Sequence, residues 1–367
     1  MMNVGMVGVG CISGIYLENF ANTFKNVKLL AVCDLVRERA ENAQRKYGVP
    51  KLYDTMEELF ADPEIDIVLN LTRPYQHYEV SKGALLAGKH VYSEKPLGAD
   101  FEEGTELVRL AQERGLWIGG APDPFMGAGI QTCRSFIDQG RMGEVIGGRC
   151  VMASRGVETW HPDPDFYYQR GGGPVLDMGP YYITALINLL GEVKRVYSTA
   201  RTTFAERLIT AKPHENEIIK VNVPTHYECL LTFTSGATVS FLTTFDTYNT
   251  KQANIQLYGT KGNLYVPDPN CFGSQNGMIF LDGASGKEET IPLAFDYSEK
   301  SRCLGLADLA AAIEQGRPPR TSYLQTYHVL EVMTGVMKSA ETGMPYEMTT
   351  HFEREAPMDP SLPHGVL

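Results

Sequence analysis

Two short stretches of the chain carry residue types that could catalyse proton transfer. One is Ser93-Glu94-Lys95-Pro96, and the other runs from Gly171 to Tyr181 with the sequence GGGPVLDMGPY. A lysine ammonium beside a tyrosine phenol stabilises the phenolate and lowers a pKa that is otherwise about 10, so such a pair can exchange protons near neutral pH. We therefore predict that Lys95, Asp177 and Tyr181 converge on an alcohol carbon.

A helix is needed to position Asp177 and Tyr181. Apolar residues follow them at helical spacing, with Pro180 where a first turn tolerates proline and Gly191 where a helix commonly ends. This pattern places both side chains at the start of a helix. The glycines before them leave a backbone that a ligand can approach closely.

The N-terminus has the order strand, glycine turn, helix. Gly8 would form the tight turn, Gly10 would admit a pyrophosphate to the helix N-terminus, and Cys11, Ile12 and Ser13 complete the loop. By itself this pattern also fits a generic turn between a strand and a helix. Asp34 ends the second strand where dinucleotide-binding folds place a ribose-binding carboxylate, which favours NAD over NADP, although Arg37 lies near enough to keep NADP open.

Strands and helices then alternate up to residue 120, which predicts a doubly wound parallel sheet in residues 1–123. Asp54 and Glu57 match a capping box for one of its short helices. Such sheets bind ligands beyond the carboxyl ends of their strands. The residues that follow these ends, and that we expect at the cofactor, are Thr72, Pro74, His77, Glu94 and Lys95.

The rest of the chain predicts an α+β domain over residues 124–345 and a C-terminal tail over 346–367. Segments with strand character recur between residues 145 and 266 with few long helices, so we expect an open, mainly antiparallel sheet. The segment 205–224 is charged and nearly patternless. We expect it to form an excursion near the sheet edge or at an oligomer interface.

A loop rich in proline and aromatic residues precedes the triple glycine. Its aromatic faces could pack on the C–H surface of a sugar, and its polar groups could bind hydroxyls. The candidate substrate-binding residues here are Trp160, His161, Asp163 and Gln169. A purely structural loop is the alternative. We expect no metal, because no second histidine stands at ligand spacing.

Composition excludes several classes of partner. The 367 residues carry a formal charge of −11 without a basic tail, so nucleic acid and anionic membranes are poor candidates. The seven cysteines are an odd number with no close pair, which is typical of buried thiols in a reducing compartment. With no basic targeting segment and no apolar run of membrane-spanning length, the sequence predicts a cytoplasmic protein.

The chain resembles the Gfo/Idh/MocA family of oxidoreductases. The shared motifs are the Gly8-x-Gly10 loop, Thr72-x-x-x-x-His77, Glu94-Lys95-Pro96, Gly171-Gly-Gly, Asp177-x-Gly179-x-Tyr181 and Gly259-Thr-Lys-Gly262, which occur in this order over most of the chain. Many members carry histidine at the last position of the Asp motif. With Tyr181 at this position, the chain resembles instead the tyrosine branch of the family, in which the phenol is the acid/base.

The resemblance implies a NAD-dependent dehydrogenase or reductase acting on a secondary alcohol of a sugar, glycoside or cyclitol. Lys95 would lie by the nicotinamide and contact the reacting hydroxyl, and the open sheet would form a homodimer or homotetramer. One alternative is a glycoside hydrolase or lyase that oxidises its substrate transiently with bound NAD. The other is a non-catalytic NAD-responsive protein, against which the intact acid/base set argues.

Overall fold

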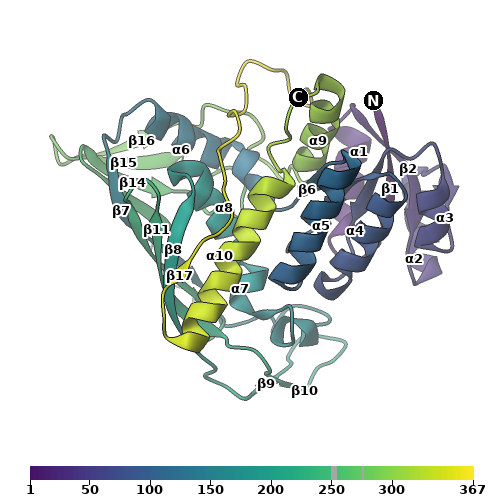
Figure 1. The fold of residues 1–367 in the computed structure, drawn as a ribbon, viewed down its shortest axis with the longest axis horizontal. Coiled ribbons are helices and arrows are strands. Elements are labelled where there is room, and N and C mark those ends of the chain that lie inside the picture. Colours follow the sequence, from purple (N-terminus) through teal and green to yellow (C-terminus); the bar gives the residue numbers. More distant parts are fainter. Residues whose placement is uncertain (249–253, 275–276) are drawn as a thin grey trace. The chain divides into compact units, whose positions relative to one another are not determined.

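The computed structural model describes residues 1–248, 254–274 and 277–367, and the chain forms two compact units. The first unit comprises Met1–Gly127, Phe295–Tyr327 and Glu355–Leu367. The second comprises Ala128–Ala294 and His328–Arg354. Each unit is therefore assembled from separate stretches of the chain, coloured along the sequence in Figure 1.

The first unit contains a six-stranded parallel sheet with the order β3-β2-β1-β4-β5-β6. The strands are β1 (Met2–Val7), β2 (Val27–Cys33), β3 (Lys51–Leu52), β4 (Ile67–Asn70), β5 (His90–Ser93) and β6 (Ile118–Gly120). All four residues of β4 are buried, as expected for a strand covered on both faces. The order reverses between β1 and β4, which confirms the predicted doubly wound sheet.

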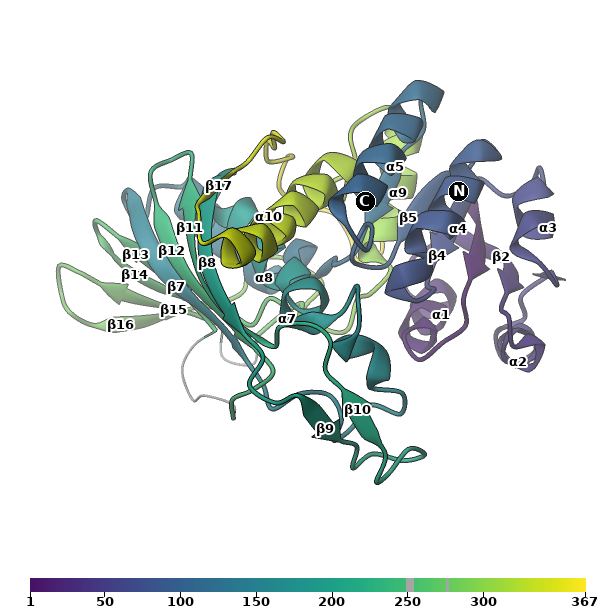
Figure 2. The same cartoon turned by 60° about the horizontal axis from the view of Figure 1, so that its bottom comes forward.

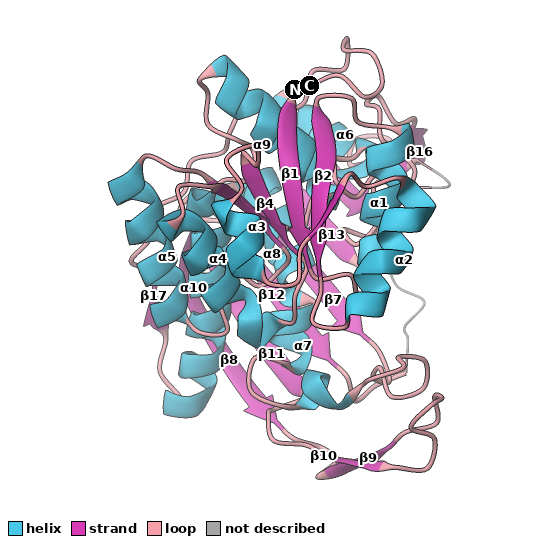
Figure 3. Cartoon of the chain, turned by 90° about the vertical axis from the view of Figure 1, so that its right-hand side faces the viewer, coloured by secondary structure: helices cyan, strands magenta, loops and turns pink. Residues whose placement is uncertain are grey.

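Helices cover both faces of this sheet. In Figure 3, α1 (Ser13–Asn22) and α2 (Arg37–Tyr47) lie on one side of β1 and β2, and α3 (Met56–Ala61), α4 (His77–Leu86) and α5 (Phe101–Arg114) lie on the other. Gly48 ends α2 in a left-handed conformation, with φ of 66°. The capping box lies one residue later than predicted: Thr55 and Glu58 form it, not Asp54 and Glu57.

The returning segment 295–327 extends this unit beside β6. It carries α9 (Leu304–Gln315) and the start of α10 (Tyr323–Thr342). The Gly120 amide donates to the Thr321 carbonyl oxygen at 2.8 Å, and the buried Asp123 carboxylate accepts from the Gly305 amide at 3.2 Å and from Arg302 at 3.4 Å. These bonds attach a late part of the chain to the end of the parallel sheet.

The second unit is built on a nine-stranded sheet with the order β16-β15-β14-β13-β7-β12-β11-β8-β17. The strands are β7 (Val145–Ala153), β8 (Val193–Arg201), β11 (His226–Phe233), β12 (Thr238–Thr244), β13 (Ile255–Gly259), β14 (Gly262–Val266), β15 (Met278–Asp282), β16 (Glu288–Ile291) and β17 (Tyr346–Glu347). Only β7 and β12 among these pair in parallel. This confirms the predicted open, mainly antiparallel sheet.

One face of the nine-stranded sheet is covered by helices. Figure 2 shows α8 (Gly179–Leu190) and α10 on the same side of it, and α6 (Ala128–Asp138) packs against β14 and β15. On the strands, buried residues alternate with exposed ones such as Tyr197 and Leu230, which pair across β8 and β11. The segment 205–224 forms a separate antiparallel hairpin of β9 (Glu206–Leu208) and β10 (Ile218–Lys220).

Candidate active site

The glycine loop after β1 has the backbone that a dinucleotide site requires. Gly8 has φ of 95°, and a Cβ there would lie 2.8 Å from the backbone carbon and oxygen of Leu71. A Cβ at Gly10 would meet no protein atom within 4 Å, so this side of the loop is open. Ser13 donates its hydroxyl to the Gly10 carbonyl oxygen at 2.7 Å. The loop is therefore closed towards β4 and open at Gly10, where Cys11 and Ile12 are also exposed.

Asp34 lies at the carboxyl end of β2 and joins this loop to the next. Its carboxylate accepts from the Val9 amide at 2.6 Å and from the Val36 amide at 2.7 Å. Arg37 is bound by two carboxylates, those of Glu41 at 2.9 Å and of Asp54. Because these acids balance its charge, Arg37 offers little attraction to a ribose 2'-phosphate, and the site favours NAD.

The residues after β4 form a connected turn. Asn70 is fully buried, and its side-chain oxygen accepts from the amide and the hydroxyl of Thr72 at 3.2 and 2.6 Å. Pro74 begins the short 3-10 helix η1 (Pro74–Gln76) that leads into α4. This turn presents its residues at the same sheet edge as the glycine loop.

His77 links this turn to the one after β5. Its Nδ1 lies 2.8 Å from the Pro96 carbonyl oxygen and its Nε2 lies 3.0 Å from the Thr72 carbonyl oxygen. Burial lowers the pKa of His77, while the two carbonyls favour the protonated ring and limit that shift. Each ring nitrogen thus faces a backbone carbonyl, and the ring donates to one of the two turns when it is neutral and to both when it is protonated.

Glu94 anchors the backbone that carries Lys95. One of its carboxylate oxygens accepts from the Tyr16 hydroxyl at 3.0 Å and the other from the Lys95 amide at 3.1 Å. Burial, followed by the Glu94 charge, raises the pKa of Tyr16, so its hydroxyl remains a donor. The Lys95–Pro96 peptide is cis, and Lys95 is half-buried. Lys95 therefore leaves β5 from a firmly held turn.

Asp177 and Tyr181 lie in the second unit, on either side of a break between two helices. Asp177 is the last residue of α7 (Gly173–Asp177), and Tyr181 lies in the first turn of α8 with 7% of its surface exposed. The hydroxyl of Thr243 in β12 donates to the Pro174 carbonyl oxygen at 3.2 Å, which fastens α7 to the sheet.

Two residues of the triple glycine lie close to other loops of the protein. A Cβ at Gly172 would lie 2.5 Å from the Phe166 carbonyl oxygen and 2.6 Å from that of Tyr167, and one at Gly173 would lie 3.3 Å from that of Pro224. The close approach that glycine permits here is made by the protein's own loops.

The loop before the triple glycine forms an aromatic cluster around His161. Its ring centroid lies 5.4 Å from that of Trp160, 5.7 Å from Phe166 and 5.1 Å from Tyr167, each in an edge contact. The Asp163 amide donates to His161 Nδ1 at 3.0 Å, so a neutral ring carries its proton on Nε2. Trp160 is 64% exposed.

Gln169, expected to bind substrate, makes several bonds within the protein. Its amide nitrogen donates to the Lys220 carbonyl oxygen at 3.1 Å and to Asp165 at 3.3 Å, and its oxygen accepts from Asn222 at 2.5 Å. These bonds tie the loop to the β9–β10 hairpin.

The expected residues thus fall into two groups. The first unit brings together Gly8, Gly10, Cys11, Ile12, Ser13, Asp34, Thr72, Pro74, His77, Glu94 and Lys95 at the carboxyl edge of the parallel sheet. The second unit carries Trp160, His161, Asp163, Gln169, Asp177 and Tyr181. Sequence analysis missed Arg207, a buried charge in the second unit whose three-residue strand, with exposed residues at both ends, gave no signal of burial.

Within 1–248, 254–274 and 277–367, no group of three or more His, Cys, Asp or Glu side chains is placed to hold a metal ion. None of the helices in these ranges is both long enough and apolar enough to cross a membrane. None of the seven cysteines, all of which lie in the described ranges, forms a disulfide, and Cys11 and Cys271 are exposed.

Two family models match the chain. Residues 2–119 match the oxidoreductase family with a NAD-binding Rossmann fold, and residues 130–265 match the GFO/IDH/MocA C-terminal domain.

Curated relatives cover part of the chain. A trans-1,2-dihydrobenzene-1,2-diol dehydrogenase from Macaca fuscata fuscata is 31% identical over 52% of this chain and 56% of its own length. An inositol 2-dehydrogenase from Salmonella paratyphi B is 32% identical over 42% of this chain and 47% of its own length. The chain thus matches about half the length of these relatives.

Solved structures match almost the whole chain. A NAD-binding oxidoreductase from Klebsiella pneumoniae, 20% identical, has a TM-score of 0.82 over 94% of this chain and 98% of its own. A levoglucosan dehydrogenase in complex with NADH and L-sorbose, 19% identical, has a TM-score of 0.80 over 95% and 99%. At this identity the likeness shows the fold.

Proposed function

Because the chain belongs to the Gfo/Idh/MocA family of oxidoreductases, we propose that it transfers a hydride between NAD and a secondary alcohol or ketone of a sugar, glycoside or cyclitol. The observation that carries the proposal is the turn after β5. Glu94 and His77 hold Lys95 there, at the same edge of the parallel sheet as the glycine loop and Asp34.

The residues of the first unit fit a dinucleotide. The open side of Gly10 and the N-terminus of α1, which has no side-chain cap, suit a pyrophosphate. The Asp34 carboxylate suits ribose hydroxyls, and exposed Ile12 and Leu35 offer apolar contact for a base. Bound NAD would supply the hydride acceptor at its nicotinamide.

The chain's own residues would handle the proton. In the oxidation, Tyr181 takes the proton of the substrate hydroxyl as the hydride leaves the same carbon; in the reduction, it returns the proton to the oxygen. The Lys95 ammonium stabilises the phenolate and binds the reacting oxygen. Asp177 binds a neighbouring hydroxyl or orients Lys95.

The substrate class is inferred from relatives and from the aromatic loop. Relatives and structural neighbours are named for a cyclic diol, inositol and levoglucosan. The rings around His161 offer faces to the C–H surface of such compounds, and polar groups of the same loop can bind hydroxyls. Trp160 and Asp163 complete this surface.

An activity screen tests the proposal. Purified protein is incubated with NAD and a panel of hexoses, inositols and glycosides, with nicotinamide absorbance and products followed together. If the proposal is right, NADH and a ketone product should accumulate in equal amounts. Product without accumulated NADH would point instead to the hydrolase with transient oxidation, which no observation of the structure favours.

Two matched pairs of variants test the acid/base set. Lys95→Met should lower turnover at least about 1,000-fold while NAD affinity changes only a few-fold, and the exposed Lys28→Met should change neither. Tyr181→Phe should abolish turnover at neutral pH. Tyr182→Phe, which alters the neighbouring phenol bonded to Asn254 at 2.7 Å, should not. Equal loss of NAD binding and turnover in Lys95→Met would make the lysine structural.

We also propose that the chain forms a homodimer or homotetramer through the exposed face of the nine-stranded sheet. Ile146, Tyr197 and Leu230 are 60%, 40% and 48% exposed on its strands. Light scattering on the purified protein would find a dimer or tetramer, and Leu230→Glu would shift it towards monomer. A wild-type monomer would contradict this proposal.

A further inference from the structure

Arg207 is a buried charge in a hairpin whose two short strands have exposed residues at both ends. It is the central residue of β9 and is 4% exposed, whereas its neighbours Glu206 and Leu208 are exposed. Its guanidinium forms ion pairs with two buried carboxylates, Glu158 at 2.9 Å and Asp246. A charge in the interior is tolerated only when it is paired in this way.

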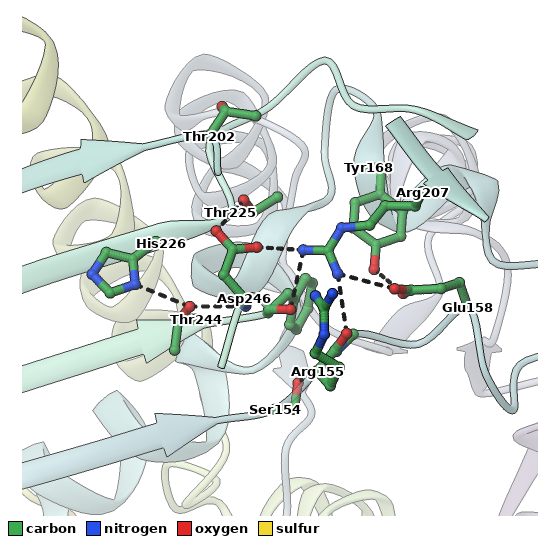
Figure 4. Close-up of polar contacts among 12 residues, drawn as sticks. Ser154, Arg155, Glu158, Tyr168, Thr202, Arg207, Thr225, His226, Thr244 and Asp246 are labelled. Carbon is green, nitrogen blue, oxygen red and sulfur yellow. Dashed lines mark hydrogen bonds and ion pairs between the residues drawn. The ribbon is translucent and has the colours of Figure 1, made fainter. Parts of the chain in front are cut away.

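The hydrogen-bond partners of Arg207 belong to two separate segments of the chain. Figure 4 shows the guanidinium between Asp246 on one side and Glu158 on the other. It also donates to the carbonyl oxygens of Arg155 at 3.0 Å, before the aromatic loop, and of Phe245 at 3.1 Å, after β12. One side chain from the hairpin thus joins the beginning of the aromatic loop to the end of a central strand.

Glu158 extends these contacts along the loop. Its second carboxylate oxygen accepts from the Tyr168 hydroxyl, ten residues further on. Its own carbonyl oxygen accepts from the amides of Thr210 and Ala211 at 3.0 and 3.2 Å. The loop between Glu158 and Tyr168 is therefore held at both ends, and the residues between them are the aromatic cluster around His161.

Asp246 and two rings complete the arrangement. The second Asp246 oxygen accepts from the Thr225 hydroxyl at 2.7 Å. The guanidinium carbon lies 5.4 Å from the centre of the Tyr168 ring and 5.0 Å from that of Phe204. Such ring contacts suit a planar guanidinium better than a lysine ammonium.

We infer that Arg207 is a positioning residue that keeps the loop from Glu158 to Gln169 in one preformed conformation. The inference rests on the proposed function, in which this loop contacts the substrate. The loop is then a fixed wall of the site and does not close over the substrate as a lid. Its aromatic rings already have their binding arrangement before the substrate binds, so binding loses little conformational entropy of the loop.

Hydrogen exchange tests the role of Arg207 without any substrate. In Arg207→Met, peptides covering 158–172 should exchange about tenfold faster or more than in wild type, while peptides of β8 and β11 stay protected. Arg195→Met is the matched control, because it removes an exposed ion pair with Glu347 in the same unit. Equal exchange of 158–172 in the two variants would overturn the inference.

Milder variants cover the case in which Arg207→Met does not fold. Tyr168→Phe removes one bond to Glu158 and should accelerate exchange of the same peptides less than Arg207→Met would. Arg207→Lys keeps the charge but cannot serve four acceptors, so it should fall between wild type and Arg207→Met. Unchanged exchange in both would overturn the inference.

Kinetics on an active substrate separate positioning from a general loss of structure. Arg207→Lys should raise KM about tenfold or more, with kcat within about threefold and NAD affinity unchanged. Exchange of 158–172 in wild type should change little when substrate is added. Strong protection on substrate addition would identify a lid and overturn the inference. If no substrate is found, the proposed function fails, while the exchange experiment still decides the role of Arg207.

Discussion

Replacing Gly8 with alanine should destabilise the first unit and disrupt its cofactor loop. Gly8 has φ of 95°, a conformation that costs an L-residue about 1–2 kcal/mol. The new Cβ would also lie 2.8 Å from the carbon and oxygen of Leu71 and 3.0 Å from the Thr72 nitrogen. These are backbone atoms at the end of β4, which cannot rotate away as a side chain can.

The two effects add to a measurable loss. Overpacking of this kind costs about 1–3 kcal/mol, so the free energy of unfolding should fall by about 2–5 kcal/mol in Gly8→Ala. Against a total of about 5–15 kcal/mol, this is a large fraction. At about 2–4 °C per kcal/mol, the melting temperature of the first unit should drop by roughly 4–20 °C.

Gly10→Ala is the matched control for the same loop. A Cβ at Gly10 would have no protein atom within 4 Å and the residue has no strained φ, so alanine there should leave stability within about 1 kcal/mol of wild type. It should still weaken NAD binding about tenfold to a hundredfold, a loss of about 1.4–2.7 kcal/mol, because the methyl group takes the space proposed for the pyrophosphate.

Thermal unfolding followed by circular dichroism and calorimetric titration with NAD measure the two effects separately. If Gly8→Ala were as stable as Gly10→Ala, the steric argument would be wrong. If Gly10→Ala bound NAD with wild-type affinity, the loop would not hold the pyrophosphate. The pair therefore distinguishes a turn needed for the fold from a surface needed for the ligand.

Three further outcomes are expected. Asp34→Ala should lower the affinity for NAD at least about tenfold and reduce the preference for NAD over NADP, because it removes the carboxylate that repels a 2'-phosphate. Titration with both cofactors measures the preference, and an unchanged preference would contradict the prediction. A thiol reagent should react with the exposed Cys11 and Cys271 in the native protein, and with all seven cysteines after denaturation. Rapid reaction of a third cysteine in the native protein would contradict this prediction. Burial lowers the pKa of His328 to about 4, so the unfolded chain binds a proton at this residue at a higher pH than the folded chain does. The free energy of unfolding therefore decreases as the pH is lowered from about 6.5 to about 4. In urea unfolding, His328→Gln should remove up to about 3 kcal/mol of that pH dependence, and identical pH profiles would refute it.

The first unit was largely predictable because its signals are local. An apolar strand followed by glycines, and polar residues after successive strands, determine a parallel sheet and the edge at which ligands bind. The capping box shows the limit of such signals: Asp54 and Thr55 are both good caps, and each has a glutamate three residues later. Only the backbone geometry selects Thr55 and Glu58.

The discontinuous units could not be predicted from such patterns. Asp123 follows β6, yet its carboxylate accepts from Arg302 and from the Gly305 amide, about 180 residues away in the chain. Burial raises the pKa of Asp123 to about 6, although the neighbouring Arg302 opposes that shift. No periodicity or spacing relates these residues, because the contact depends on where the returning segment packs.

The difference between local patterns and long-range contacts also affects how polar residues at this site are interpreted. His77 and Glu94 are polar residues in motifs and Gln169 lies in the aromatic loop, and in each case protein groups lie within hydrogen-bonding distance of both polar atoms of the side chain. These bonds hold the backbone around Lys95 and the aromatic loop in place. Arg207 acts on that loop in the same way, from a strand whose composition resembles a solvated edge. A motif thus predicts where chemistry occurs, but the bonding partners of each polar group decide whether it contacts substrate or supports a residue that does.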